Sequence, residues 1–406
     1  MAKLLVLSNG HGEDVIAVKV IEALQSLSPH SLIQALPLVG TGHTYQSKDI
    51  SLIGPAQTLP SGGFIYMDSW QLWRDLQAGL IPLTLAQWHT IRQWRRSGGQ
   101  ILAVGDLIPL LLAWLSGVDY AFIGTAKSEY YLQDGQGWLP STKFWECWLG
   151  ADYYPWEIGL MKSPRCRAVF PRDSLTHQCL QARGVRSYDL GNPMMDGLAV
   201  NTDGLAASPG PGLCILLLPG SRSPEAERNW QCLLQALEGI FTLFVGQPIQ
   251  VLAALAPALD PASFLQALIV HQWQEIKPQI FQRHQAFLHL SQNDYAAYLH
   301  QAQVALAMAG TATEQFVGLG KPVVSIVGTG PQFNRQFALR QTRLLGESVT
   351  LVEEPPQVAL TLAQLLKDTA KLERIAHNGP RRLGPPGAAD RIAQTLQQLW
   401  STSPER

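Results

Sequence analysis

The stretch Leu216-Leu217-Leu218-Pro219-Gly220-Ser221-Arg222 decides the fold expected of this chain. A short apolar run predicts a buried strand, and the Pro-Gly pair ends it in a tight turn where glycine fits the corner. Backbone N–H groups at a strand-to-helix turn bind anions, and the helix dipole strengthens that site. Arg222 adds a planar fork for phosphate oxygens. The stretch therefore predicts an α/β domain with an anion site.

A second stretch, Met308-Ala309-Gly310-Thr311-Ala312-Thr313-Glu314, repeats this order about ninety residues later. An apolar strand again meets a turn of small residues and then a helix start. Glu314 lies one helical turn in, where a carboxylate can accept hydrogen bonds from sugar hydroxyls. The two stretches together predict a site for a nucleotide sugar. The alternative is that each is an ordinary turn of an α/β domain, with glycine serving the corner alone.

Strands and helices alternate along most of the chain, which indicates parallel sheets covered on both faces. A Gly, Pro and Ser-rich stretch at 203–212 interrupts the pattern and is the best linker candidate. The fold class expected is therefore α/β, with two doubly wound, Rossmann-like domains. The expected strands are 4–7, 32–36, 101–104, 120–123, 214–218, 249–253, 286–290, 304–307 and 322–326; the expected helices are 13–27, 228–244, 261–273, 295–301, one from Thr313, 356–372 and 388–400.

Composition excludes several classes of protein. With 406 residues, 46% hydrophobic residues, 15% charged residues and a net charge of −1, the chain suits two globular domains and does not indicate nucleic-acid binding. Its five cysteines form no C-x-x-C pair and its histidines no H-E-x-x-H pair, so we expect no disulfide framework, no metal and no cofactor. The run at 4–7 lacks the features of a signal peptide, and 107–118 is shorter than the roughly twenty residues of a membrane span. We expect a cytoplasmic protein.

Further motifs carry a resemblance to a known family. Phe170-Pro171-Arg172-Asp173 and Leu190-Gly191-Asn192-Pro193-Met194-Met195-Asp196, with the two turns above, resemble lipid-A-disaccharide synthase over nearly the whole chain. The resemblance is closest to the cyanobacterial-type branch related to that synthase, whose members open with a signature like that of Ser8 to Asp14. The synthase itself carries a different turn there. The chain therefore departs from it where an acceptor binds.

The resemblance implies a GT-B glycosyltransferase with an interdomain cleft. The domains implied are 1–200 for the acceptor, a linker at 201–212, 213–385 for the UDP-sugar, and a helix at 386–406 that packs back on the first domain. By the family pattern, Ser221 and Arg222 hold the diphosphate and Glu314 holds the ribose hydroxyls. The approach to the phosphates is assigned to Gly310, Thr311 and Thr313. Amides that contact the donor hexose are assigned to Gln332, Asn334 and Gln336.

Two residues compete as the base that removes a proton from the acceptor hydroxyl. Asp106 follows the strand at 101–104, and the synthase places its essential Asp in an equivalent stretch; alternatively, Asp106 only caps a helix. His11 is the rival, because the N-terminal Gly-rich turn of the peptidoglycan N-acetylglucosaminyltransferases also ends in His. The neighbouring Gly10, Gly12 and Glu13 belong to the same acceptor-side loop.

Tryptophans indicate a membrane surface. Nine of the twelve lie between residues 70 and 156, interleaved with arginines, and aromatic rings beside basic side chains suit a bilayer interface. The alternative is that most of these rings are core. Residues 60–94 lie where the synthase carries its membrane-docking patch. The expected membrane contacts are Phe64, Trp70, Trp73, Trp88, Arg92, Arg95 and Arg96.

The sequence thus favours an inverting, metal-independent glycosyltransferase that moves a sugar from a UDP-sugar to a membrane-lipid acceptor. The expected location is the cytoplasmic side of the inner or thylakoid membrane, with peripheral association, and a homo-oligomer is compatible with the pattern. The first alternative is an isomerase or hydrolase like UDP-N-acetylglucosamine 2-epimerase. The second is a non-catalytic protein that binds a nucleotide sugar or a lipid.

Overall fold

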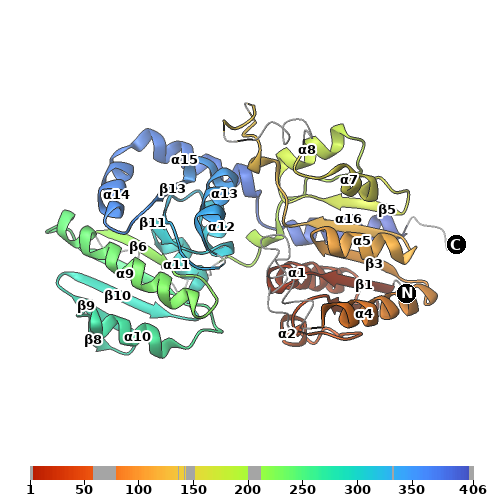
Figure 1. Cartoon of the computed structure of the whole chain (residues 1–406), viewed down its shortest axis with the longest axis horizontal. Helices are drawn as coiled ribbons and strands as arrows, with labels where there is room; N and C mark the ends of the chain where they lie inside the picture. The colour runs from red at the N-terminus through yellow and green to blue at the C-terminus, as the bar shows by residue number, and fades with distance from the viewer. Residues whose placement is uncertain are drawn as a thin grey trace. The chain divides into compact units, whose positions relative to one another are not determined.

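Two compact units make up the chain in the computed structural model, which describes residues 3–57, 79–135, 137–140, 142, 151–199, 212–331 and 333–401. Unit 1 comprises Met1–Asp196 and Gly384–Arg406, and unit 2 comprises Gly197–Leu383 (Figure 1). The chain thus enters unit 2 once and returns to unit 1 for its last helix. Most of the expected linker, 201–211, lies outside the described residues.

Unit 1 holds a parallel sheet in the order β2-β1-β3-β4-β5. The chain moves from β1 outward to β2 and then crosses to β3 on the other side of β1, so the strand order reverses between β1 and β3. The elements are β1 (Lys3–Ser8), α1 (His11–Leu27), β2 (Leu32–Pro37), α2 (His43–Gln46), α4 (Leu80–Arg96), β3 (Gln100–Gly105), α5 (Leu107–Ser116), β4 (Tyr120–Gly124), η1 (Glu129–Tyr131), α7 (Pro155–Met161), β5 (Cys166–Phe170), α8 (Ser174–Ala182), η2 (Pro193–Met195) and α16 (Ala388–Ser401).

Both faces of this sheet are buried. Leu4 and Val6 of β1 face the core that includes α1 and α16, whereas Leu5 and Leu7 face the core that includes α4 and α5. Successive strand residues point to opposite faces, so a strand covered on both sides must be apolar throughout. This explains why β1 reads as a continuous apolar run.

The Leu190–Asp196 motif fastens α16 to unit 1. The Asp196 carboxylate accepts hydrogen bonds from the backbone N–H groups of Gly387 (2.5 Å), Ala388 (3.1 Å) and Ala389 (2.7 Å) at the start of this helix. Gly191 has a φ of 84°, and a Cβ there would lie 3.1 Å from the Pro385 carbonyl oxygen. The motif therefore has a structural role, which is to hold the returning chain against unit 1.

Unit 2 holds a sheet in the order β13-β12-β11-β6-β7-β10-β9-β8. The β10–β9 and β9–β8 pairings are antiparallel, and the other pairings are parallel. The strand order reverses between β6 and β11. The elements are β6 (Leu213–Leu218), α9 (Glu225–Leu243), β7 (Ile249–Ala254), α10 (Pro261–Val270), β8 (Gln274–Lys277), β9 (Ile280–Arg283), β10 (Ala286–Ser291), α11 (Tyr295–Gln301), β11 (Val304–Ala307), α12 (Thr311–Gly318), β12 (Val323–Ile326), α13 (Arg335–Leu345), η4 (Gly346–Ser348), β13 (Val349–Val352), α14 (Gln357–Lys367) and α15 (Thr369–Leu383).

The prediction of two doubly wound parallel sheets is confirmed, but some elements were missed. The sequence pattern predicts no strand at β5 or β13 and no β8–β9 hairpin, and it predicts one helix at 356–372 where α14 and the start of α15 lie. All four residues of β8 are exposed. Such an edge strand lacks the apolar pattern by which buried strands are found.

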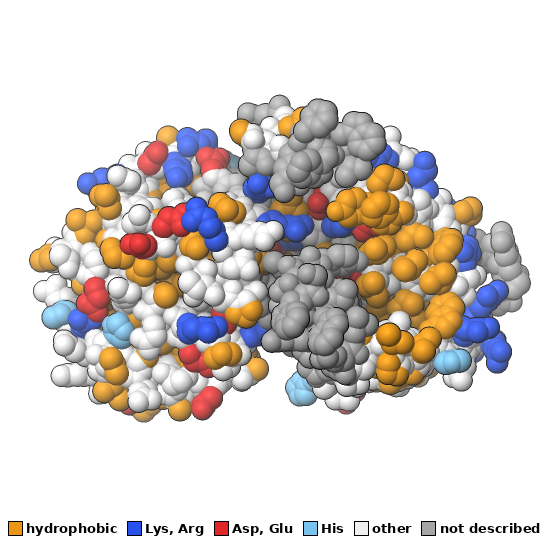
Figure 2. Space-filling model, in the orientation of Figure 1, with side chains coloured by type: hydrophobic (Ala, Val, Ile, Leu, Met, Phe, Trp, Pro, Cys, Tyr) orange, Lys and Arg blue, Asp and Glu red, His pale blue; other side chains and the backbone are white. Residues whose placement is uncertain are grey.

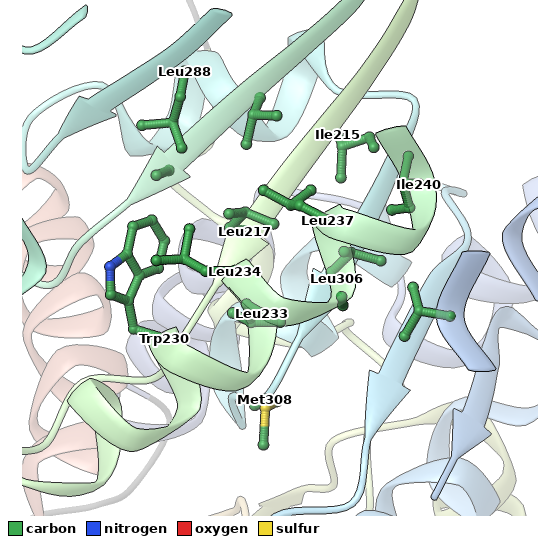
Figure 3. Packing of buried hydrophobic residues seen from close by; sticks show 14 of the residues in the cluster. Ile215, Leu217, Trp230, Leu233, Leu234, Leu237, Ile240, Leu288, Leu306 and Met308 are labelled. Atoms are coloured by element: carbon green, nitrogen blue, oxygen red, sulfur yellow. The ribbon is translucent and has the colours of Figure 1, made fainter. Parts of the chain in front are cut away.

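Helix α9 covers one face of the unit 2 sheet (Figure 3). Leu233, Leu234 and Leu237 pack toward the strand residues Ile215 and Leu217 in one core cluster. Trp230, at the start of the same helix, is buried, and its indole N–H donates to the Phe264 carbonyl at 3.2 Å. The helix that follows the Pro219–Arg222 turn is therefore fixed rigidly on the sheet.

Replacing Asp196 with Ala should loosen α16. Three backbone N–H groups lose one charged acceptor, which we expect to cost about 1–3 kcal/mol of local stability. Native-state hydrogen exchange of the α16 amides measures this loss. Asp390→Ala is the control, because Asp390 is an exposed carboxylate in the first turn of the same helix. Equal acceleration in both variants would contradict the specific role of Asp196.

Candidate functional site

In unit 2 the two turns singled out in the sequence lie side by side. Strands β6 and β11 are paired in parallel, with Leu218 opposite Ala307, and the Met308 N–H donates to the Leu218 carbonyl at 2.9 Å. The turn after β6 and the turn after β11 therefore leave the same edge of the sheet as neighbours. Ligands of doubly wound sheets bind at such a point of reversed strand order, beyond the carboxyl ends of the strands.

A buried amide joins these two turns. Asn229 of α9 donates from Nδ2 to the Pro219 carbonyl (2.9 Å) and to the Met308 carbonyl (3.2 Å). Gly220 has a φ of 106°, in the left-handed region that favours glycine, and a Cβ there would lie 3.4 Å from the Met308 carbonyl oxygen. The backbone of the β6 turn is thus held close to that of the β11 turn.

Ser221 and Arg222 follow Gly220 in the chain, and α9 begins shortly after them at Glu225. Ser221 is exposed and Arg222 is half-buried. Their place next to a helix start agrees with the geometry of an anion site, in which backbone N–H groups and the helix dipole face the ligand. The Arg222 carbonyl accepts from the Ala226 N–H at 2.9 Å, so the turn continues into the helix without a break.

The β11 turn opens α12. Gly310 precedes the helix and Thr311, its first residue, is exposed. Thr313 is buried, and its hydroxyl donates to the Ala309 carbonyl at 2.6 Å. Glu314 is 8% exposed. The Thr313 side chain therefore braces the turn from within, which leaves Gly310 and Thr311 at the accessible part of it.

Helix α13, which follows strand β12, also holds the turn after β11 in place. The amide of the buried Gln341 donates to the carbonyls of Ala309 (3.0 Å) and Gly310 (3.2 Å). A Cβ on Gly310 would lie 3.5 Å from the tip of the Phe337 ring. Because α13 follows β12, the loops after β6, β11 and β12 meet at one edge of the sheet.

The three expected hexose-contacting amides belong to the segment that joins β12 to the first turn of α13. Asn334 caps α13, since its Oδ1 accepts from the Phe337 N–H at 2.9 Å. Gln336 lies exposed in the first turn of α13, and Gln332 lies outside the described residues. The loop also reaches α9, because the Phe333 N–H donates to Oε1 of Glu225 at 2.6 Å.

Unit 1 has a corresponding edge at the ends of β1 and β3. Ser8 and Val104 are partners in the parallel pairing. Gly105, with a φ of 134°, lies so close that a Cβ on it would be 3.2 Å from Cβ of Asn9 and 3.4 Å from Cγ of Glu13. The N-terminal Gly-rich turn and the turn that carries Asp106 are therefore neighbours.

The Asp106 carboxylate caps a helix and also has a raised pKa. It caps α5, because Oδ1 accepts from the Ile108 N–H at 3.0 Å. Burial raises the pKa of Asp106 to about 6, assisted by the negative charges of Glu13 and Glu157 and opposed by the Ile108 N–H. A carboxylate with a pKa close to neutrality suits proton transfer. The capping interpretation from the sequence is thus correct, and it is compatible with a role as base.

The other expected residues of unit 1 lie on or beside α1. Gly10 precedes the helix with a φ of 153°, His11 is its first residue, and Gly12 is exposed. Glu13 is half-buried, and its Oε1 accepts from the Thr125 hydroxyl at 3.2 Å. Thr125 follows β4, so the turns after β1, β3 and β4 converge on Glu13.

A second carboxylate with a raised pKa lies just behind this turn. Asp14 is 3% exposed and accepts from the Ser8 hydroxyl at 2.5 Å, and Ser8 in turn accepts from the Tyr45 hydroxyl at 2.6 Å. Burial raises the pKa of Asp14 to about 7, opposed by the Ser8 hydroxyl and assisted by Glu13. This chain of hydroxyls fixes the first turn of α1 on β1.

An exposed aromatic and aliphatic face lies over α4, α5 and α7, which pack side by side in unit 1 (Figure 2). We call it the apolar face, and it consists of Ile81, Leu85, Leu115, Tyr154 and Trp156. The rings of Tyr154 and Trp156 stack with centroids 4.6 Å apart. Exposed apolar patches of this kind are a feature of interaction surfaces.

The expected membrane contacts divide into three groups. The side chains of Arg92, Arg95 and Arg96 are exposed on the C-terminal half of α4, the helix that supplies Ile81 and Leu85 to the apolar face. Trp88 is half-buried and packs against the core of unit 1. Phe64, Trp70 and Trp73 lie outside the described residues.

Sequence reasoning missed the side chains that hold the turns in place. Asn229, Gln341, Glu225 and Asp14 are all buried polar residues within helices. A polar residue on the apolar side of a helix was a usable signal, because such a group is hydrogen-bonded when buried. The partner, however, is a backbone group from another strand, and local pattern does not identify it.

Two negative findings concern the described residues alone. Within those ranges, no three His, Cys, Asp or Glu side chains are grouped to hold a metal ion. No helix there combines the length and apolar character needed to cross a bilayer.

Comparisons of the whole chain identify its fold. No family model and no curated protein matches the sequence. Solved structures do match: S. aureus MnaA with UDP (12% identity, 99% of this chain and 98% of that one, TM-score 0.59), UDP-GlcNAc 2-epimerase from Neisseria meningitidis bound to UDP-GlcNAc (14%, 98% and 100%, 0.57) and MurG from Acinetobacter baumannii (14%, 98% and 100%, 0.58). The chain therefore has the GT-B fold, in which two Rossmann-like units occur in one chain.

Proposed function

We propose that this protein is an inverting, metal-independent glycosyltransferase that transfers a sugar from a UDP-sugar to a lipid acceptor at a membrane surface. Within the GT-B fold it would be related to lipid-A-disaccharide synthase. The observation that supports this proposal most strongly is that the turns Pro219–Arg222 and Gly310–Glu314 lie side by side where the strand order of unit 2 reverses. Structures of this fold with UDP or UDP-GlcNAc bound support the choice of donor.

Unit 2 would bind the donor through its backbone. The turns after β6 and β11 would present N–H groups to the diphosphate, with Ser221 and Arg222 adding charged and neutral donors. Glu314, near the start of α12, would accept from ribose hydroxyls. This arrangement stabilises the negative charge that develops on the diphosphate as its bond to the sugar breaks, and it needs no metal ion.

Unit 1 would bind the acceptor and supply the base. The acceptor hydroxyl oxygen forms a bond to the anomeric carbon, the bond from that carbon to the diphosphate oxygen breaks, and UDP leaves with the bonding electron pair. The hydroxyl proton goes to the carboxylate of Asp106, whose pKa of about 6 keeps it mostly ionised at pH 7 to 8. His11, at the start of α1, is the alternative base.

The apolar face supports a lipid as the acceptor. Trp156 and Ile81, each 58% exposed, belong to one patch of apolar side chains on neighbouring helices, and exposed patches rather than single side chains mark interaction surfaces. The exposed Arg92, Arg95 and Arg96 on α4 suit an anionic bilayer, which adds about 1 kcal/mol for each basic side chain near its surface. We therefore propose peripheral membrane association through this face.

A second candidate function is isomerisation or hydrolysis of UDP-N-acetylglucosamine. The structural neighbours include 2-epimerases, so the fold serves both chemistries. Turnover of UDP-GlcNAc by the purified protein without lipid would favour this function. UDP release that appears only when membrane lipid is added would favour the transferase. UDP binding without turnover, across panels of donors and lipids, would favour a binding protein instead.

Arg222→Ala should weaken binding of UDP more than binding of uridine. The loss of one charged hydrogen bond to the diphosphate corresponds to about 1.5–3 kcal/mol. Isothermal titration calorimetry without added metal measures both ligands. Arg228→Ala, on an exposed position of α9, is the matched control. Equal losses for UDP and uridine would remove Arg222 from the phosphate site.

Asp106→Asn should lower turnover by roughly 100- to 10,000-fold and leave UDP affinity nearly unchanged. The Asn oxygen can still accept from the Ile108 N–H, so this variant keeps the cap of α5 and loses only the basic group. UDP release from UDP-GlcNAc with membrane lipid extract is the assay. If Asp106→Asn is near wild type while His11→Ala is folded but inactive, His11 is the base.

Trp156→Ser with Leu85→Ser should reduce sedimentation with anionic phospholipid vesicles, because both side chains belong to the apolar face. Binding of the wild type should weaken as salt rises, since the attraction is screened beyond about 10 Å at 0.1 M salt. Val245→Ser with Ile269→Ser in unit 2 removes comparably exposed apolar groups and serves as control. Absence of vesicle binding at low salt would remove the membrane part of the proposal.

A further inference from the structure

Glu225 connects two loops of the unit 2 edge that come from different strands. It lies in the first turn of α9, three residues after Arg222, and is 7% exposed. Its Oε1 accepts from the Phe333 N–H at 2.6 Å, across 108 positions of sequence. Phe333 belongs to the loop that follows β12, and β11 lies between β12 and β6 in the sheet. The bond therefore spans the carboxyl end of β11.

Close packing accompanies this bond. A Cβ on Gly330 would lie 2.0 Å from Oε1 of Glu225 and 2.6 Å from its Cγ, so the loop backbone rests directly on the Glu225 side chain. The loop is closed on itself by the bridge between Thr329 and Asn334. Only a residue without a side chain allows this approach while Glu225 is present. The loop and the first turn of α9 thus form one packed unit.

We propose that Glu225 is a positioning residue that sets the discrimination between donor sugars, by holding the loop 327–334 at a fixed place relative to the Ser221–Arg222 turn. This inference rests on the proposed UDP-sugar donor. Ser221 and Arg222 would bind the diphosphate, whereas Asn334 and Gln336 would contact the sugar, as the family resemblance implies. Glu225 itself contacts no substrate in this proposal. It acts through the backbone of Phe333.

Physical chemistry favours a carboxylate in this place. A negative side chain is stabilised in the first turn of a helix, and a bond from a backbone N–H to a charged acceptor is stronger than one to a neutral acceptor. Discrimination between similar sugars requires donors and acceptors held in fixed positions, because only then does a misplaced hydroxyl leave a partner unpaired. A loop free to shift would accept several sugars with similar affinity.

The test compares four full-length variants with the wild type: Glu225→Gln, Glu225→Ala, Gly330→Ala and the double variant Glu225→Ala with Gly330→Ala. Calorimetry measures affinity for UDP and for a panel of UDP-GlcNAc, UDP-glucose, UDP-galactose and UDP-GalNAc. Hydrogen exchange of the 327–334 amides without ligand measures the tether itself. Phe333→Leu is a further control, because it alters the side chain and keeps the backbone N–H that Glu225 binds.

Glu225→Ala should narrow the spread of affinities across the sugar panel by about tenfold, with UDP affinity changed much less. Glu225→Gln should retain the spread, because its amide oxygen still accepts from the Phe333 N–H. Gly330→Ala should act like Glu225→Ala by displacing the loop. The double variant should be no worse than Glu225→Ala alone, since removing the carboxylate makes room for the new methyl group.

Two outcomes would overturn the inference. One is an unchanged spread of sugar affinities in Glu225→Ala. The other is additive effects in the double variant, which would show that Glu225 and the loop act independently. If the wild type binds neither UDP nor any UDP-sugar, the proposed function fails. In that case, unchanged hydrogen-exchange rates of the 327–334 amides in Glu225→Ala would also refute the role of Glu225 in holding the loop. Faster rates would show that Glu225 holds the loop but would leave no role in sugar discrimination.

Discussion

Parallel pairing of strands that are distant in sequence is the constraint on which both candidate edges depend. In unit 2 the pairing of β6 with β11 brings together turns about ninety residues apart, and in unit 1 the pairing of β1 with β3 does the same for the Gly-rich turn and Asp106. Each pairing occurs where the strand order reverses. Ligands of doubly wound sheets bind at such points, beyond the carboxyl ends of the strands.

Carboxylates that are buried or half-buried play two distinct parts in the two units. Asp196, Glu225 and Asp173 accept backbone N–H groups and so fasten one segment of chain to another; Asp173, for example, caps α8 and also accepts from the Ser128 hydroxyl at 2.7 Å. Asp106 and Asp14 lie beside the unit 1 turn, where burial and the nearby Glu13 raise their pKa values to about 6 and about 7. The first kind builds the scaffold. The second kind provides groups that change protonation near neutral pH, as proton transfer requires.

The sequence predicted the two doubly wound sheets because buried parallel strands are continuous apolar runs separated by helical periodicity. It also offered the Asp106 cap of α5 as the alternative to a role as base, because this cap joins residues only two positions apart. The exposed β8 was missed because this edge strand carries polar residues and lacks the buried pattern. β13 is mostly apolar, and it was missed because four residues are too few to show the period of a strand.

The sequence by itself determined most of the buried strands, the turns that end them and the residue types that each turn presents, because these follow from the preferences of neighbouring residues. Only the tertiary structure decided which turns meet and what holds them together. Asn229 donates to two carbonyl groups, Gln341 donates to two others, and Glu225 accepts from the Phe333 N–H. Each of these contacts joins segments that are far apart in sequence. A buried polar side chain must find a partner, but its identity depends on the order in which strands pair, and that order is a property of the whole fold.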